Sequence, residues 1–246
     1  MAGLKHIALI LLLVALAPFS GSAQDRNAID VEEILNHLRD RFNRIQDYQV
    51  DLQVSLDMPM LRMPRKNMTF SFKQPDLTRL EARGFAMVPR RGLALSPDSL
   101  LQSLHDLELA GDTLIDGHLC AILQGREQGL DDLDLQARLF VDRNLWLLRG
   151  LSTYLDDEEI FRLRTEYQEV APDIYMPSLT QLRFQVNERF LRGRRFRNEH
   201  FDPDIPEPVL PEGQDLTGEA AITFNNYRIN LGLPDSYFQE DTQVEE

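Results

Sequence analysis

The side chains that most often carry out chemistry in proteins are sparse in this sequence and show no recognised spacing. Apart from His6 near the start, the histidines are His37, His105, His118 and His200, which lie far apart along the chain. Metal sites usually place such ligands at short, regular spacings. The sequence also lacks the nucleophile-elbow, phosphate-loop, H-E-x-x-H and C-x-x-C motifs. These absences predict a chain without enzymatic activity, cofactor or metal ion.

Two acidic runs could supply paired carboxylates for acid–base chemistry or for a calcium ion. They are Asp131-Asp132 and Asp156-Asp157-Glu158-Glu159. Both runs fall at predicted turns, where acidic side chains are usually solvated. We therefore favour a turn over a site for each run. Cys120 is the only cysteine, which excludes an internal disulfide, and its neighbours Leu119 and Ala121 predict a buried thiol.

The overall charge argues against a nucleic-acid partner. The chain has 40 Asp and Glu against 26 Lys and Arg, a formal net charge of −14, whereas nucleic-acid binding requires cations that neutralise phosphates. One cationic cluster could contact anionic lipid headgroups or pair with the acidic segment 202–217, and pairing is slightly favoured. The cluster consists of Arg189, Arg192, Arg194, Arg195 and Arg197, interleaved with Phe190, Leu191 and Phe196.

The first 23 residues show the three-part pattern of a secretory signal peptide. A basic start at Lys5 and His6 is followed by an apolar run over 7–19 and by the small residues Gly21-Ser22-Ala23. The apolar run is short for a membrane span, so we expect export and cleavage after about Ala23, with an uncleaved anchor as the alternative. We expect one domain over 24–238 and a disordered acidic tail over 239–246.

One amphipathic helix and a long series of strands must position the remaining side chains. The helix is expected over 31–46, where Asp30 can cap the first turn and apolar residues recur at helical spacing. From 48 to 57 the apolar period changes to two, which predicts a half-buried strand. Further strands are expected around 68–72, within 77–89, on both sides of Asp116-Gly117, over 134–142, 145–154 and 159–169, and around 182–186 and 220–224.

This count gives about ten or eleven strands with one apolar face. The helix over 31–46 and a second, short helix expected near 98–105 cannot cover that face. Such a sheet must close into a barrel, pack as a sandwich or curl around a helix. In the curled arrangement, the apolar surface that the helix leaves uncovered is a cavity for one hydrophobic ligand. A fully packed β core without a ligand is the alternative that the pattern leaves open.

The order of these pieces resembles the LolA-like group of envelope lipoprotein carriers, which includes LolB and RseB-type periplasmic proteins. The helix runs into Tyr48-Gln49-Val50-Asp51-Leu52, and the segment 70–76 resembles the F-x-x-K-x-P segment of that group. Leu139 to Arg143, with Trp146, is similar to its central hairpin, and the segments 224–230 and 233–238 are similar to its closing strand and turn. The resemblance implies a mainly β (α+β) fold, an unclosed antiparallel half-barrel of about 11 strands with a helical lid.

The same resemblance implies a monomeric periplasmic carrier or chaperone that holds lipoprotein acyl chains or lipid on its concave face for envelope transport. The alternative is an envelope-stress sensor or regulator of RseB type, which binds a membrane-protein partner through the same fold. LolA carriers often have Arg at the position of Gln74, where it holds the lid shut. A neutral amide cannot reproduce the bidentate, charge-assisted contacts of Arg, so a latch of that kind is not expected here.

Two sets of residues are predicted to form the ligand site. The apolar set expected to line the cavity, with ordinary core as the alternative, is Leu35, Leu38, Phe42, Val50, Leu52, Met68, Phe70, Phe72, Phe161, Leu163, Leu182, Phe184, Ile222 and Phe224. The set expected at the cavity mouth is Met58, Met60, Met63 and Lys73. Methionine adapts to varied apolar partners, although a loop packed over the sheet edge would explain the methionines equally well.

Overall fold

The computed structural model describes residues 30–58, 61–82, 101, 104–128, 134–186 and 216–239. These residues form one long helix, α1 (Val31–Asn43), ten strands and a short helix, α4 (Ser236–Gln239). The strands are β1 (Asp47–Met58), β2 (Leu61–Lys73), β3 (Leu77–Ala82), β4 (Leu104–Ile115), β5 (His118–Gln128), β6 (Asp134–Asp142), β7 (Leu148–Leu155), β8 (Glu158–Ala171), β9 (Ile174–Val186) and β10 (Leu216–Ile229). No helix among the described residues is long and apolar enough to cross a membrane.

Several sequence predictions fall outside the described residues. They concern the signal segment 1–23, Asp131-Asp132, the arginines of 189–197, the acidic segment 202–215 and the tail from residue 240 onward. The predicted turn at Asp156-Asp157 is confirmed, since both residues have positive φ angles and join β7 to β8.

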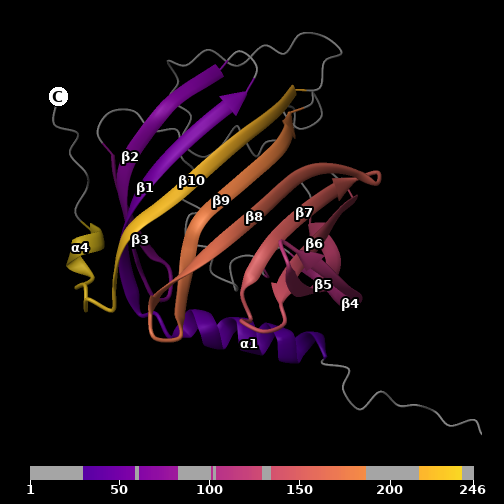
Figure 1. Cartoon of the computed structure of the whole chain (residues 1–246), viewed down its shortest axis with the longest axis horizontal. Coiled ribbons are helices and arrows are strands. Elements are labelled where there is room, and N and C mark those ends of the chain that lie inside the picture. The colour runs from indigo at the N-terminus through magenta and orange to yellow at the C-terminus, as the bar shows by residue number, and fades with distance from the viewer. Residues whose placement is uncertain are drawn as a thin grey trace, which may run out of the picture.

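All ten strands belong to one antiparallel sheet in the order β3-β2-β1-β10-β9-β8-β7-β6-β5-β4. The sheet curls without closing, and β3 and β4 are its two edges (Figure 1). Because β10 pairs with both β1 and β9, the first and last strands of the chain are neighbours. The predicted open half-barrel is confirmed, with ten strands in the described residues.

Period-two patterning explains why these segments form strands with one buried face. In β1, Tyr48, Val50, Leu52 and Val54 are buried, and the residues between them are more exposed. The predicted hairpin between β4 and β5 is also confirmed. Asp116 and Gly117 have φ angles of 49° and 83°, as a tight two-residue hairpin turn requires.

Helix α1 lies across the concave face of the sheet. Ile34 and Leu38 pack in a hydrophobic cluster with residues of β5, β6 and β7, whereas Phe42 packs against Phe72 of β2 with ring centroids 5.6 Å apart. Strands β2 and β5 are seven strand spacings apart, or about 33 Å along the sheet. The helix from Val31 to Phe42 is only about 16 Å long. The helix spans both clusters because the sheet curls towards it (Figure 1).

Charged contacts hold the C-terminal end of α1 against the turn between β8 and β9. Arg41 Nη1 lies 2.6 Å from Asp173 Oδ1, and Arg44 pairs with the other carboxylate oxygen. Gln74 contributes a weaker contact, because its Nε2 donates to the carbonyl of Ile45 at 3.2 Å. The helix is thus fixed to the sheet by arginines of its own last turn.

The segment after β10 is fastened to the ends of β1 and β2. The buried carboxylate of Asp47 accepts the backbone N–H groups of Leu231, Gly232 and Leu233. Lys73 Nζ donates to the carbonyl of Leu233 at 2.7 Å and pairs with Asp235. These contacts provide hydrogen-bond partners for polar groups at this end of the sheet.

Candidate functional site

The concave face has an apolar region that lies away from α1. The contacts of α1 with Asp173 mark one end of β8 and β9. Phe161 lies near the other end of β8, about 35 Å further along the strand. There Phe161 pairs with Phe184, and Leu163 pairs with Leu182. We call these four residues the distal apolar patch.

The distal patch differs in its packing from the residues beneath α1. Within the described part of the chain, its four residues belong to neither of the two hydrophobic clusters around the helix. Leu163 is buried, whereas Phe161, Leu182 and Phe184 are only partly buried. Three large apolar side chains therefore keep exposed surface on the concave face.

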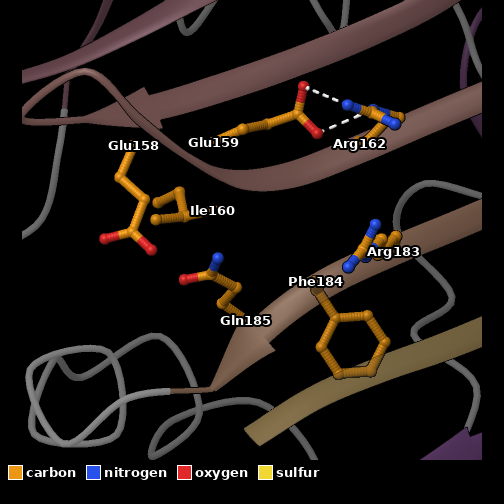
Figure 2. A pocket seen from close by; sticks show the side chains of 7 residues that line it. All are labelled: Glu158, Glu159, Ile160, Arg162, Arg183, Phe184 and Gln185. Carbon is orange, nitrogen blue, oxygen red and sulfur yellow. Dashed lines mark hydrogen bonds and ion pairs between the residues drawn. The ribbon is translucent and has the colours of Figure 1, made fainter. Parts of the chain in front are cut away.

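Beside the patch, strands β8 and β9 separate. Their pairing ends at Phe161 and Phe184, although β8 begins three residues earlier, at Glu158, and β9 continues two residues further, to Val186. Beyond that point β8 pairs with β7 and β9 pairs with β10. The fork encloses a pocket of about 260 Å³ (Figure 2). It is lined by Glu158, Glu159, Ile160, Arg162, Arg183, Phe184 and Gln185.

Residues from both faces of the sheet border this pocket. Phe184 belongs to the concave face, whereas its neighbours Arg183 and Gln185 point to the other side, as alternation along a strand requires. A methyl group on Gly218 of β10 would lie only 2.5 Å from the ring of Phe184. The ring thus rests on Gly218 and leans towards β10 (Figure 2). Any Cβ at this position would displace the ring.

The predicted cavity residues separate into three groups in the structure. Val50, Leu52, Met68, Phe70, Phe72 and Phe224 form a buried cluster, with Phe42 and Ile222 packed against it. Leu38 belongs to the second buried cluster, with Leu35 at its margin. Phe161, Leu163, Leu182 and Phe184 form the distal patch. The first two groups pack among themselves and against α1, which leaves the third as the candidate site.

The residues predicted for the cavity mouth are not brought together. Lys73 ends β2 beside Asp235, whereas Met58 and Met63 lie at the other end of the β1–β2 hairpin. Met60 and the side chains of Met58 and Met63 fall outside the described residues. A hairpin places its turn and its ends far apart, even though Met63 and Lys73 are only ten residues apart in the sequence.

A buried polar cluster on the outer face has a structural role. Asp142 Oδ1 accepts the N–H groups of Asn144 and Leu145, and Oδ2 accepts Nε of Arg149 at 3.0 Å. Burial alone would raise the pKa of Asp142, but these donors outweigh burial and lower it. His118 Nδ1 lies 3.2 Å from the same carboxylate. Both carboxylate oxygens of Asp142 accept hydrogen bonds that close the hairpin between β6 and β7. We therefore assign this cluster a structural role.

Two further potentially reactive side chains, His37 and Cys120, are packed against other residues. His37 stacks on Trp146 with ring centroids 4.4 Å apart. Cys120 is fully buried, as predicted, and burial raises the pKa of its thiol to about 11. The described residues contain no group of three or more His, Cys, Asp or Glu side chains that could hold a metal ion.

Comparison with solved structures identifies the fold. A DUF1329 family protein from Desulfovibrio piger aligns over 88% of this chain and 99% of its own, with 14% identity and a TM-score of 0.53. A putative outer membrane lipoprotein-sorting protein domain from Vibrio parahaemolyticus aligns over 84% of this chain and 96% of its own, with 10% identity and a TM-score of 0.51. The chain has a LolA-like fold.

The chain shares this fold with these two proteins at very low sequence identity. A LolA superfamily protein from Nitrosomonas europaea is also similar, with 11% identity, 87% of this chain and 99% of that chain covered, and a TM-score of 0.48. No protein family model matches the sequence, and no curated protein matches it either.

Proposed function

We propose that the protein is an exported carrier or chaperone that holds acyl chains of a lipoprotein or lipid against the distal apolar patch. The observation that carries this proposal is the incomplete burial of Phe161, Leu182 and Phe184 on the concave face, outside both clusters packed around α1. Contiguous apolar surface of this kind marks a binding surface more often than an ordinary exterior.

The energetics of acyl-chain binding suit such a patch. Each buried methylene contributes about 0.8 kcal/mol, so a long chain needs no polar partner to bind. The half-barrel offers an apolar face without closing around it, which permits entry from the open side. Binding of this kind forms no covalent bond and needs no catalytic residue.

Two further observations support a role in the cell envelope. The first 23 residues have the pattern of a secretory signal peptide. The Vibrio parahaemolyticus domain with the same fold is described as a lipoprotein-sorting protein. A periplasmic carrier of lipoproteins or lipid accounts for both observations.

The test is recovery of bound lipid from the exported protein. The full chain is expressed with its N-terminal segment in a bacterium with an outer membrane, purified without detergent, and examined by native mass spectrometry. We expect co-purifying acyl lipid, and the delipidated protein should bind a fluorescent fatty acid. Lipid-free protein that also fails to bind the fatty acid contradicts the proposal. A membrane-protein partner recovered without lipid would favour an RseB-type sensor instead.

A matched pair of variants localises the binding. Leu182→Gln places a polar group in the distal patch and should weaken fatty-acid binding by about tenfold, since it removes apolar contact worth over 1 kcal/mol. The control is Leu114→Gln, because Leu114 is 69% exposed at the edge strand β4. Equal loss in both variants would exclude the distal patch as the site.

A further inference from the structure

We propose that the outer face of strands β5 to β9 is a docking surface for an anionic phospholipid bilayer. Five arginines define this surface, and we call them the arginine face: Arg126, Arg138, Arg162, Arg164 and Arg183. This inference goes beyond the carrier function, because docking on a bilayer and uptake of an acyl chain are separate events that are measured separately.

Strand register places all five side chains on one face. Arg138 of β6 lies opposite Ser152 of β7, which lies opposite Arg162 of β8. Arg162 in turn lies opposite Arg183 of β9. Arg164 lies two residues after Arg162 on β8. On β5, Gln124 lies opposite Arg138, and Arg126 follows Gln124 by two residues. Residues two apart on a strand share a face, so the arginines form one array across five neighbouring strands.

The arginine face stands out because few of its members form ion pairs, although the chain is very acidic. Within the described residues, Arg162 is the only one of the five that forms an ion pair, with Glu159 at 2.6 Å. Arg138 donates to Gln124 and stacks on Tyr154, and Arg164 stacks on Phe140. Glu166 and Glu219 share this face, and Glu219 lies directly opposite Arg183 on β10. Within the described residues, neither glutamate forms an ion pair with the five arginines. Arg126 and Arg183 are exposed, and their side chains form no ion pair or hydrogen bond with the described residues.

Like charges are also crowded on this face. Arg162 and Arg183 are directly opposite each other on paired strands, an arrangement that repulsion makes unfavourable. Burial, followed by the charge of Arg162, lowers the pKa of Arg164. An anionic partner would relieve this repulsion.

The pocket at the fork favours a lipid surface over an acidic peptide. Arg162 and Arg183 line the same pocket as Phe184, which belongs to the concave face (Figure 2). Two arginines thus border the same pocket as an apolar ring, together with Glu158 and Glu159. A phospholipid has a phosphate next to an acyl chain, so it matches both features, whereas an acidic peptide matches only the first. Guanidinium groups also bind phosphate oxygens in a bidentate manner.

Vesicle flotation tests this inference. The purified full chain is mixed with vesicles of phosphatidylglycerol and phosphatidylcholine, or with vesicles of phosphatidylcholine alone. We expect binding only to the anionic vesicles, decreasing as salt screens the charges. The double variant Arg126→Gln/Arg183→Gln should bind about 30-fold more weakly, since each arginine near an anionic surface contributes about fivefold. Neither side chain forms an ion pair or hydrogen bond within the described part of the chain, so the variant should fold normally.

The matched control is Arg65→Gln/Arg228→Gln, which removes two exposed arginines from β2 and β10. It has the same net charge and should bind within about twofold of the unchanged protein. Equal loss in both double variants, or equal binding to neutral vesicles, overturns the inference. So does binding of a polyglutamate peptide without binding of anionic vesicles, which would indicate an acidic protein partner. Fluorescent fatty-acid binding is measured in parallel, and its failure would contradict the carrier function alone.

Discussion

Arg149 holds the buried carboxylate of Asp142 through two nitrogens, with Nε and Nη2 each 3.0 Å from Oδ2. Asp142 is fully buried and Arg149 nearly so. The pair joins the end of β6 to the start of β7, next to the cluster that packs under α1. The hairpin that supports the helix thus depends on a charged contact inside the protein.

We expect Asp142→Asn to lower the free energy of unfolding by about 3 kcal/mol, because Arg149 would remain buried without a counter-charge. Urea unfolding followed by circular dichroism measures the loss. Arg149→Met alone should also destabilise the protein, whereas the double variant should lose less than the sum of the two single variants. Strict additivity would show that the two side chains are not coupled.

The contact between α1 and Asp173 should depend on pH. Hydrogen bonds from Arg41 and then from Arg44 lower the pKa of Asp173 below its ordinary value. Because the pKa is lower in the folded state, the contact stabilises the protein above the unfolded pKa and is lost as pH falls through the folded pKa. We expect hydrogen-exchange protection of the last turn of α1 to fall in that acidic range.

In the Asp173→Asn variant, the last turn of α1 should already have low hydrogen-exchange protection at neutral pH. This protection should not fall further in acid. The control is Asp157→Asn, since Asp157 is also an exposed turn residue with positive φ. If both variants retained protection at neutral pH, the arginines would not be holding the helix through Asp173.

A single tryptophan can report on the distal patch. Trp146 is the only tryptophan in the chain and lies beside α1, stacked on His37. We expect a spin-labelled fatty acid to quench the fluorescence of a Trp146→Phe/Phe184→Trp variant strongly and that of the unchanged protein weakly. Strong quenching of Trp146 itself would place the acyl chain under the helix rather than at the fork.

Gly218→Ala should alter the patch without unfolding the protein. The new methyl group would lie 2.5 Å from the Phe184 ring, so the ring must move. Alanine also reduces the conformational freedom of the unfolded chain relative to glycine. The free energy of unfolding should therefore stay within about 1 kcal/mol of its original value. We expect fatty-acid affinity, measured by fluorescence titration, to change several-fold. In a Phe184→Ala background the same substitution should have no effect on affinity.

Sequence patterning predicted the elements whose two faces differ most. Strict alternation located β1 from Tyr48 onward, and Asp116-Gly117 located the hairpin between β4 and β5. The first half of β4 was missed because it lies at the sheet edge, where few of its residues are buried and positive φ angles at Asp106 and Gly111 interrupt it. Most of the first half of β9, from Ile174, was missed because Pro177 and several polar residues break the pattern.

The candidate site was less predictable than the fold. Phe161 and Phe70 both occupy apolar positions of alternating strands, yet Phe70 is core and Phe161 is in the distal patch. The difference is where α1 crosses the sheet, which depends on contacts such as Arg41 with Asp173 that no local pattern contains. The arginine face was missed for a similar reason. Its five members come from four strands, and only the register brings them together.

The position of β10 has a consequence for how the protein is made. Strands β1 to β3 and strands β4 to β9 are two separate antiparallel meanders that are joined by strand pairing only through β10, the last of the ten described strands to be synthesised. Until that strand is available, each meander has an unpaired edge and an uncovered apolar face, a state prone to aggregation. Formation of the native sheet must therefore wait for nearly the whole chain, and we infer slow, post-translational folding that depends on holding chaperones.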